Sequence, residues 1–206
     1  RDRGQPDAVP LYTKDDVREA LRQLRPLPYD APTEVLPGVE ATFREAGHIL
    51  GSSSVELRAD GRKLVFSGDL GPKGTPILRD PAVITGADLV LMESTYGDRL
   101  HRERAATIEE IGGILDDAWR GGGVVLIPAF AVGRSQELLY WFAKYWDEWR
   151  MSRWQIVLDS PMAAKVVEVY DRHQDLFDEE ARAVWCERPN PFRMPNLRIT
   201  ETVDES

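Results

Sequence analysis

The chain has few of the residues that most often carry reactive chemistry. Its 206 residues include one cysteine, Cys186, and three histidines, His48, His101 and His173. A single cysteine cannot form an internal disulfide, which suits a reducing compartment and predicts a cytoplasmic location. Cys186 lies in a charged stretch without an activating neighbour, so we interpret it as a structural thiol and not as a nucleophile.

Long apolar runs and an excess of positive charge are also missing. No run approaches the roughly 20 apolar residues that cross a bilayer, so we expect no membrane association. The first residues lack the apolar stretch of a secretory signal and an initiator Met, and we expect the chain to begin inside a longer product. The net charge of −9 argues against nonspecific coating of nucleic acid but is compatible with a local basic cleft.

The first half of the chain has the pattern of a helix followed by strands. Thr13 is a good N-cap for a helix over residues 14–25, and a proline-rich segment at 26–37 ends it. Strand-like runs follow at residues 39–43, 54–57, 63–66 and 89–92. Gly61 marks the turn of a hairpin between the second and third of these runs.

In the second half, strand and helix patterns alternate. Helices are predicted at residues 105–119, 133–149 and 161–176, and buried strands at 124–128 and 156–158. This alternation favours a parallel α/β layer. The proline-rich segment 187–195 is predicted to be extended. The long second helix has an aromatic face, which we interpret as core or inter-domain packing, with a base-stacking platform as the alternative.

Four segments share one design, in which a strand-like run enters a polar or glycine-rich loop. They are Gly-His-Ile-Leu-Gly-Ser at 47–52, Phe-Ser-Gly-Asp-Leu-Gly at 66–71, Glu-Ser-Thr-Tyr-Gly-Asp at 93–98 and Pro-Ala-Phe-Ala-Val-Gly-Arg-Ser-Gln-Glu at 128–137. Loops at strand ends often hold functional groups on a rigid scaffold. Taken singly, His48 is better explained as a structural hydrogen-bonding residue, and Asp69 as a turn residue.

Together and in this order, the four segments resemble the β-CASP branch of the metallo-β-lactamase superfamily, which includes ribonuclease J and the nuclease of pre-mRNA 3′-end cleavage. The segments at 158–163 and 195–206 also look like that family. The resemblance implies an α/β (α+β sandwich) fold. We expect residues 1–102 to be part of a metallo-β-lactamase αββα sandwich and residues 103–206 to be part of the inserted α/β β-CASP lobe.

The resemblance also implies site residues. His48 matches the third metal-binding motif and would ligate one zinc, whereas Asp69 matches the fourth and would bridge two zinc ions. Glu93 opens the β-CASP signature and would support a catalytic histidine. Gly133, Arg134 and Ser135 begin a helix whose N–H groups could face an RNA phosphate, although a helix cap and a surface charge explain Arg134 and Ser135 equally well.

The chain departs from the family pattern in its histidines. The main motif His-x-His-x-Asp-His is absent, and His101 and His173 match no ligand position, so we interpret both as surface or helix residues. Because the internal motifs look intact, we interpret the sequence as a piece of a longer enzyme that is inactive alone.

The function predicted for the complete protein is a zinc-dependent RNA endonuclease, with exonuclease activity as an addition, acting on single-stranded RNA through two metal ions. A homodimer is left open. The alternatives are a catalytically inactive β-CASP scaffold that binds RNA, and another hydrolase with the metallo-β-lactamase fold. Thioesterase and lactamase types lack the inserted lobe that the second half resembles, which argues against them.

Overall fold

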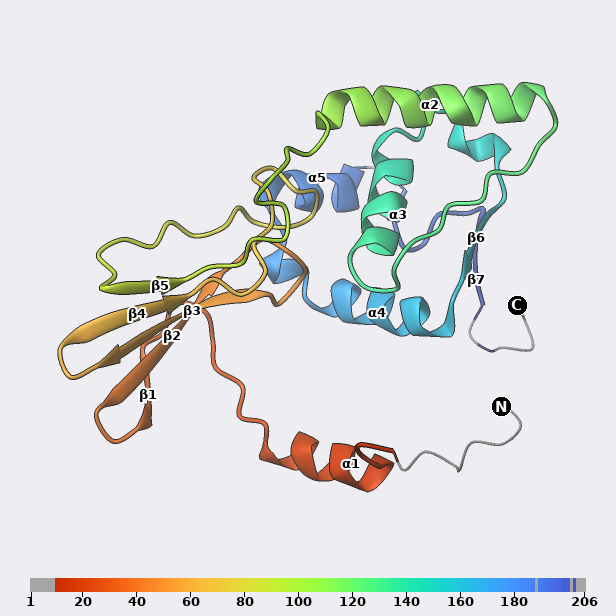
Figure 1. Ribbon diagram of the computed structural model, residues 1–206. Helices are drawn as coiled ribbons and strands as arrows, with labels where there is room; N and C mark the ends of the chain where they lie inside the picture. Colours follow the sequence, from red (N-terminus) through yellow and green to blue (C-terminus); the bar gives the residue numbers. More distant parts are fainter. Residues whose placement is uncertain (1–9, 188, 201, 203–206) are drawn as a thin grey trace, which may run out of the picture.

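A five-stranded sheet forms the first part of the fold. The computed structural model describes residues 10–187, 189–200 and 202, and Figure 1 shows the sheet on one side of it. Its strands, in spatial order, are β1 (Thr33–Leu36), β2 (Val39–Glu45), β3 (Ser53–Ala59), β4 (Arg62–Phe66) and β5 (Leu89–Leu91). Neighbouring strands are antiparallel except β4 and β5, which are parallel.

The β3–β4 hairpin shows how local sequence sets the register. Asp60 and Gly61 have φ angles of 49° and 72°, so both central turn residues adopt the left-handed conformation. Such a two-residue turn has the twist that joins antiparallel strands, and Asp-Gly is among its preferred sequences. The hairpin predicted at Gly61 is therefore confirmed, with Ala59 paired to Arg62.

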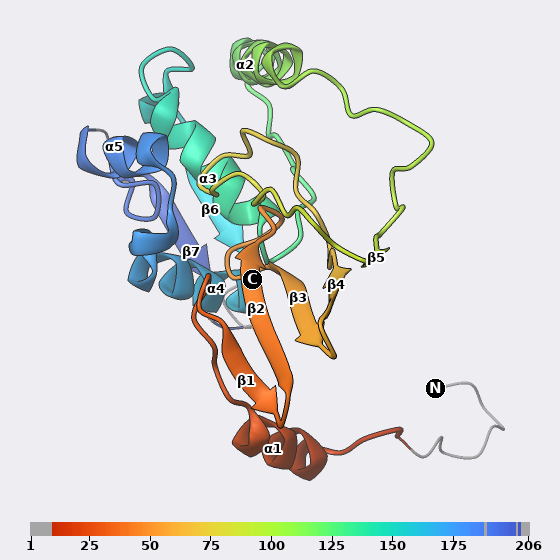
Figure 2. The same cartoon turned by 90° about the vertical axis from the view of Figure 1, so that its left-hand side faces the viewer.

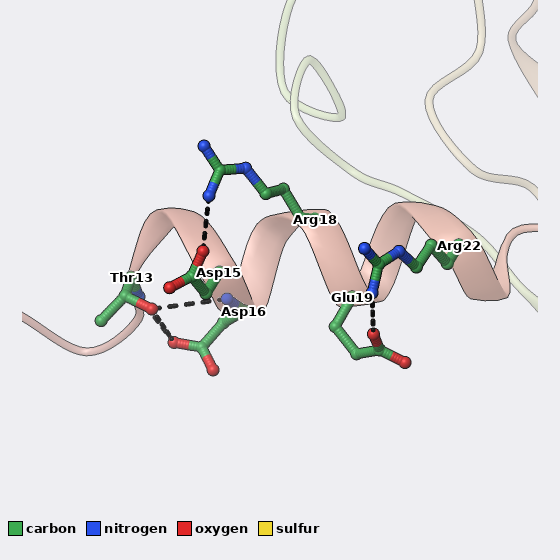
Figure 3. A network of polar contacts seen from close by, with 6 residues as sticks. All are labelled: Thr13, Asp15, Asp16, Arg18, Glu19 and Arg22. Atoms are coloured by element: carbon green, nitrogen blue, oxygen red, sulfur yellow. Dashed lines mark hydrogen bonds and ion pairs between the residues drawn. The ribbon is translucent and has the colours of Figure 1, made fainter.

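The first helix, α1 (Lys14–Gln23), begins where the sequence predicts (Figure 3). Thr13 Oγ1 accepts the N–H of Asp16, and the Asp16 carboxylate accepts the N–H of Thr13 at 2.7 Å, which makes a reciprocal cap. Ion pairs Arg18–Asp15 and Arg22–Glu19 follow along the helix. None of its residues is buried, so the cap and these exposed pairs stabilise the helix locally.

The second part of the fold contains a smaller sheet at its edge and helices α2 to α5 (Figure 1). Its elements are α2 (Arg104–Arg120), α3 (Arg134–Lys144), η1 (Met151–Arg153), β6 (Ile156–Asp159), α4 (Pro161–Arg172), η2 (Gln174–Leu176), α5 (Glu179–Glu187) and β7 (Leu197–Thr200). Strands β6 and β7 are parallel and form a sheet separate from the first. The mixed α/β class is thus confirmed. No described helix is both long and apolar enough to cross a bilayer.

The aromatic side chains of α3 and of the chain that follows it lie in the core. Tyr140, Trp141 and Trp149 are buried, and Trp149 stacks on Tyr145 with ring centroids 4.7 Å apart. They belong to one cluster of buried residues that extends to α4 and α5. Core packing, and not a base-stacking platform, therefore explains this face.

Two sequence-based predictions about element length are wrong in this half. Helix α3 ends at Lys144 and does not reach residue 149, because the chain turns and Arg150 adopts a left-handed conformation with φ of 51°. This turn places Trp149 and Met151 in the core, where a straight helix would not bring them. Likewise the helix predicted over 161–176 changes at residue 173, where η2 follows α4.

Two further segments differ from prediction. Residues 124–128 join no strand in the part of the chain that the structure describes, and Val124 and Leu126 are exposed. Only Val125 packs against the core there, so the apolar run lacks the two covering layers of a buried strand. The segment predicted to be extended over 187–195 instead turns at Asn190, whose side chain accepts the N–H of Phe192 at 2.9 Å. That turn buries Phe192 and Met194.

A loop from the first half joins the two halves. Ile77 and Leu78 are buried. Ile77 belongs to the core of the second part of the fold, from α2 to β7, which we call the helical half. The Ile77 carbonyl accepts the N–H of Asp178 at 2.9 Å, and Leu78 forms an antiparallel bridge with Phe177. Figure 2 shows the loop between β4 and β5 passing beside the helices of the second part of the fold. The loop that follows β4 is therefore fixed against the buried cluster of the second part of the fold.

We predict that Phe177→Ala destabilises the protein by about 3–5 kcal/mol, because the ring is fully buried between the two halves. Urea unfolding followed by tryptophan fluorescence measures the loss. Leu126→Ala is the control, since this side chain is 87% exposed and should change stability by at most about 0.5 kcal/mol. A loss at Leu126 as large as that at Phe177 would contradict the description of the core.

Candidate functional site

The strand directions bring three of the four predicted loops to one edge of the large sheet. Strands β2 and β4 are each antiparallel to β3, and β5 is parallel to β4. The carboxyl ends of β2, β4 and β5 therefore lie at the same edge. The loops that leave these ends carry His48, Asp69 and Glu93.

The His48 and Asp69 loops meet backbone to backbone. The N–H of Gly71 donates to the carbonyl of Ala46 at 2.9 Å. A Cβ atom added at Gly71 would lie 1.7 Å from the carbonyl oxygen of Gly47 and 2.8 Å from the nitrogen of His48. Only glycine permits this approach, which places Asp69 two residues from a direct contact with the His48 loop.

Glu93, which follows β5, contacts the loop that carries Asp69. Its Oε1 accepts the N–H of Leu70 at 2.7 Å, and its own N–H donates to Ser67 Oγ at 3.0 Å. Hydrogen bonds from the Thr95 side chain and from the Leu70 N–H lower the pKa of Glu93, and the nearby His48 lowers it further. The half-buried Glu93 is therefore ionised at neutral pH and holds the loop that carries Asp69.

The fourth loop reaches the same place from the helical half. A Cβ at Gly133, whose φ is 84°, would lie 3.1 Å from Cγ2 of Ile49, so the α3 loop packs beside the His48 loop. Gln136 ties this loop together, accepting the N–H of Gly133 at 2.8 Å and donating to the carbonyl of Ala131 at 3.1 Å. The site thus lies at the junction of the two halves.

The two predicted phosphate-binding residues have different environments. Ser135 is buried, and its hydroxyl donates to the carbonyl of Phe130 at 2.7 Å, so that side chain shapes its own loop. Arg134 is exposed and forms an ion pair with Glu137 at 2.5 Å. Of the two side chains, only the guanidinium of Arg134 is available at the surface of the site.

His48 and Asp69 are both exposed, whereas His101 and His173 are exposed elsewhere. The ring of His101 contacts Tyr96, with centroids 4.4 Å apart, and His173 caps the end of α4. Both are exposed, which agrees with their interpretation as surface and helix residues.

The donors at this junction do not make a metal site by themselves. Within residues 10–187, 189–200 and 202, no three His, Cys, Asp or Glu residues gather in a group that could hold a metal ion. A protein zinc site uses three or four protein ligands. His48 and Asp69 together provide an imidazole and a carboxylate, which is a partial donor set.

Sequence reasoning missed the residues that support these loops. Ser52 Oγ accepts the N–H of His48 at 3.1 Å, and the hydroxyl of Tyr170 accepts the N–H of Leu50 at 3.4 Å. The serine four residues after His48 is a local signal that could have been read as a turn-forming side chain. Nothing local could have revealed Tyr170, which is 120 residues away from Leu50 along the chain.

Comparison with known proteins places the chain among RNA-processing relatives. Residues 135–206 match the Beta-Casp domain family. The chain is 44% identical over 197 residues to Ribonuclease TTHA0252 of Thermus thermophilus, an alignment that covers 96% of this chain and 45% of that protein. It is 28% identical over 197 residues to Endoribonuclease YSH1 of Yarrowia lipolytica, covering 94% of this chain and 24% of that protein. 

An RNase J-like protein of Methanocaldococcus jannaschii is 29% identical over 188 residues, with 88% of this chain and 44% of that protein covered. In each of these three alignments the chain spans less than half the length of the relative. At least 88% of this chain is aligned in each of the three comparisons.

We predict that Gly71→Ala destabilises the protein by about 1–3 kcal/mol, because the new methyl group must push the His48 loop away. Urea unfolding measures the change. The control is Gly113→Ala in the middle of α2, where an added Cβ meets nothing within 4 Å. That change should stabilise the protein by about 0.5–1 kcal/mol, since alanine favours helix. Equal effects of both substitutions would rule out the close approach.

We predict that Glu93 makes stability depend on pH. Its folded-state pKa is lower than the ordinary value of 4.5, so the ionised carboxylate stabilises the fold above pH 4.5. This contribution is lost as the pH falls below 4.5 through the lower folded-state pKa. In Glu93→Gln the amide oxygen still accepts hydrogen bonds but carries no charge. Urea unfolding between pH 3 and pH 7 should therefore show parent and variant converging at the acid end, and a constant difference would disprove the assignment.

Proposed function

We propose that the chain belongs to the β-CASP nucleases of the metallo-β-lactamase superfamily, which its motifs resemble, and that the complete protein is an RNA endonuclease. The observation that carries the proposal is the junction where the His48, Asp69, Glu93 and Gly133 loops meet. Two relatives are named ribonuclease or endoribonuclease, and one is named RNase J-like. Hydrolysis of phosphodiester bonds in single-stranded RNA, from within the strand and also from its end, is the activity we propose.

The proposed domains follow the two sheets. Residues 1–102 would belong to a metallo-β-lactamase sandwich and residues 103–206 to a β-CASP lobe, with the site between them. The separate β1–β5 and β6–β7 sheets support this division. The insertion of Ile77 into the helical core means that the two parts share a packed interface and not only a linker.

The proposed cofactor is zinc, with two ions in the complete protein. An imidazole from His48 and a carboxylate from Asp69 are donor types that zinc takes in proteins. The described residues provide too few donors, so we propose that the other ligands come from further segments of the complete protein. When bound, such ions would supply an activated water and neutralise charge on the scissile phosphate.

The proposed roles of the remaining residues follow from their contacts. Glu93 would keep the Asp69 loop in place through its bond to the Leu70 N–H, and would remain charged at neutral pH. Arg134 would exchange its ion pair with Glu137 for an RNA phosphate, since the Arg134 side chain is 62% exposed. Ser135 would act through the backbone at the start of α3, since its hydroxyl is already used.

The proposal also covers the location and the oligomeric state of the protein. The single cysteine cannot form an internal disulfide, which suits a reducing compartment, and we propose a cytoplasmic location. A homodimer, which light scattering of the purified protein tests directly, is the oligomeric state we propose. RNA is the proposed substrate, and at a net charge of −9 its binding must depend on local cations and weaken as salt rises.

A catalytically inactive, RNA-binding scaffold is the second candidate. The presence of His48, Asp69 and Glu93 argues against it. Metal-dependent cleavage by the complete protein separates the two candidates. A scaffold would bind RNA with the same salt dependence but would leave the RNA intact with every divalent ion.

We predict that Asp69→Asn in the complete protein lowers the rate of RNA cleavage by several orders of magnitude. Asparagine keeps the size of the side chain but removes the negative charge that would hold the cations and the attacking water. The measurement is cleavage of labelled single-stranded RNA with zinc present. Asp117→Asn is the matched control, because this aspartate lies on α2 with its side chain 83% exposed.

The chain of 206 residues is a second control in that assay. With only His48 and Asp69 as recognised donors, it should bind zinc weakly and leave RNA uncut. Robust metal-dependent cleavage by this chain would overturn the assignment of missing ligands. Normal cleavage by full-length Asp69→Asn would show that Asp69 is only a turn residue.

A further inference from the structure

The loop that carries His48 has an unusual set of hydrogen bonds. Glu45 Oε1 accepts the N–H of Gly47 at 2.8 Å. Ser52 Oγ accepts the next two N–H groups, from His48 at 3.1 Å and from Ile49 at 3.2 Å. The hydroxyl of Tyr170 accepts the next N–H group, from Leu50, at 3.4 Å. Four consecutive N–H groups, from Gly47 to Leu50, therefore donate to side-chain oxygens. Backbone groups in a loop between strands have no ladder partner, so these oxygens specify the conformation.

The acceptors are themselves held in place. The carbonyl of Ser52 accepts the hydroxyl of Tyr29 at 2.7 Å, and the N–H of Ser52 donates to the carbonyl of Ile49 at 2.9 Å. Tyr170 is 3% exposed and lies in α4, within the core of the helical half. A side chain fixed by its own contacts can orient a neighbouring loop without losing much conformational freedom on doing so.

The same loop contacts both halves through apolar side chains. Ile49 lies against Gly133, at 3.1 Å from the position of an added Cβ. Leu50 packs against the buried cluster of the helical half. The position of the His48 backbone therefore depends on the sheet half through Glu45 and Ser52, and on the helical half through Tyr170 and these two contacts.

We propose that Glu45, Ser52 and Tyr170 are positioning residues for His48, and that Tyr170 makes the placement of His48 depend on the docking of the helical half. The inference rests on the proposed function, in which His48 is a metal donor. None of the three side chains is placed as a donor or against the scissile bond. Their oxygens act through the backbone, and a donor must be held within tenths of an ångström to serve one ion.

Hydrogen exchange of the backbone amides tests the bonds in this chain. Ser52→Ala removes one acceptor for two N–H groups, so the amides of His48 and Ile49 should exchange about tenfold faster. Ser52→Thr keeps a hydroxyl and should restore slow exchange. Tyr170→Phe keeps the buried ring and should speed exchange at Leu50 only. Faster exchange across the whole molecule would mean global destabilisation and would overturn the assignment of local bonds.

The mobility of the His48 ring distinguishes positioning from mere support of the fold. NMR relaxation of the three imidazoles gives this mobility, with His101 and His173 as internal references. The His48 ring should be more ordered than both references in the parent, become as mobile as they are in Ser52→Ala, and regain order in Ser52→Thr. An unchanged His48 ring in Ser52→Ala and Tyr170→Phe would overturn the proposal.

A zinc titration of the complete protein, followed at the same imidazole signal of His48, keeps the two proposals separate. Loss of a supporting contact typically lowers metal affinity about tenfold or more, so zinc should perturb His48 at correspondingly higher concentration in Ser52→Ala. If zinc leaves His48 of the parent unperturbed while the ring mobility changes as expected, the metal role fails and the positioning role stands. If zinc perturbs His48 equally in parent and Ser52→Ala, the positioning role fails.

Discussion

The close approach of Gly71 to the Gly47–His48 peptide is the constraint on which the rest of the site depends. No side chain fits between these backbones, because a Cβ at Gly71 would lie 1.7 Å from the Gly47 oxygen. The bond from Gly71 to Ala46 fixes the end of β4 against the end of β2. With the two loops fixed, the N–H of Leu70 reaches Glu93 at the end of β5, and the loop that carries Asp69 lies against the loop that carries His48. The close approach of Gly71 to Gly47 thus brings together two loops whose predicted donors, His48 and Asp69, lie 21 residues apart in sequence.

Much of the fold could be predicted from local sequence because local chemistry determines it. Thr13 caps α1, and Asp60 and Gly61 form the hairpin turn that sets the register between β3 and β4. Prediction failed where the burial of a segment depends on parts of the chain that are distant in sequence. The run at 124–128 is apolar enough for a buried strand, yet its neighbours among the described residues leave Val124 and Leu126 exposed. An apolar pattern indicates that a segment is suited to burial, but it does not identify what covers it.

The candidate site divides in the same way. The motifs pointed to His48, Asp69 and Glu93, and their loops do meet at one edge of the sheet. The supporting residues were not predictable, since Tyr170 and Ile77 act across long separations in the chain and have no distinctive neighbours in sequence. The aromatic residues after Gly133 were ambiguous in sequence because an aromatic side chain suits both a core and a nucleic-acid surface. Burial decides for the core.

Ile77 shows how firmly the two halves are joined. Its φ of 74° is a left-handed conformation that a β-branched residue avoids, at a cost of about 1–3 kcal/mol. The surroundings offset this cost, because the side chain is buried in the helical core and the carbonyl accepts the N–H of Asp178. The loop that contains Ile77 begins directly after Gly71 and returns to the sheet at β5. A loop anchored in this way connects the Asp69 end of the site to the helical half, while Tyr170 connects the His48 end to the same half. The helical half therefore holds both ends of the site, although it supplies neither His48 nor Asp69.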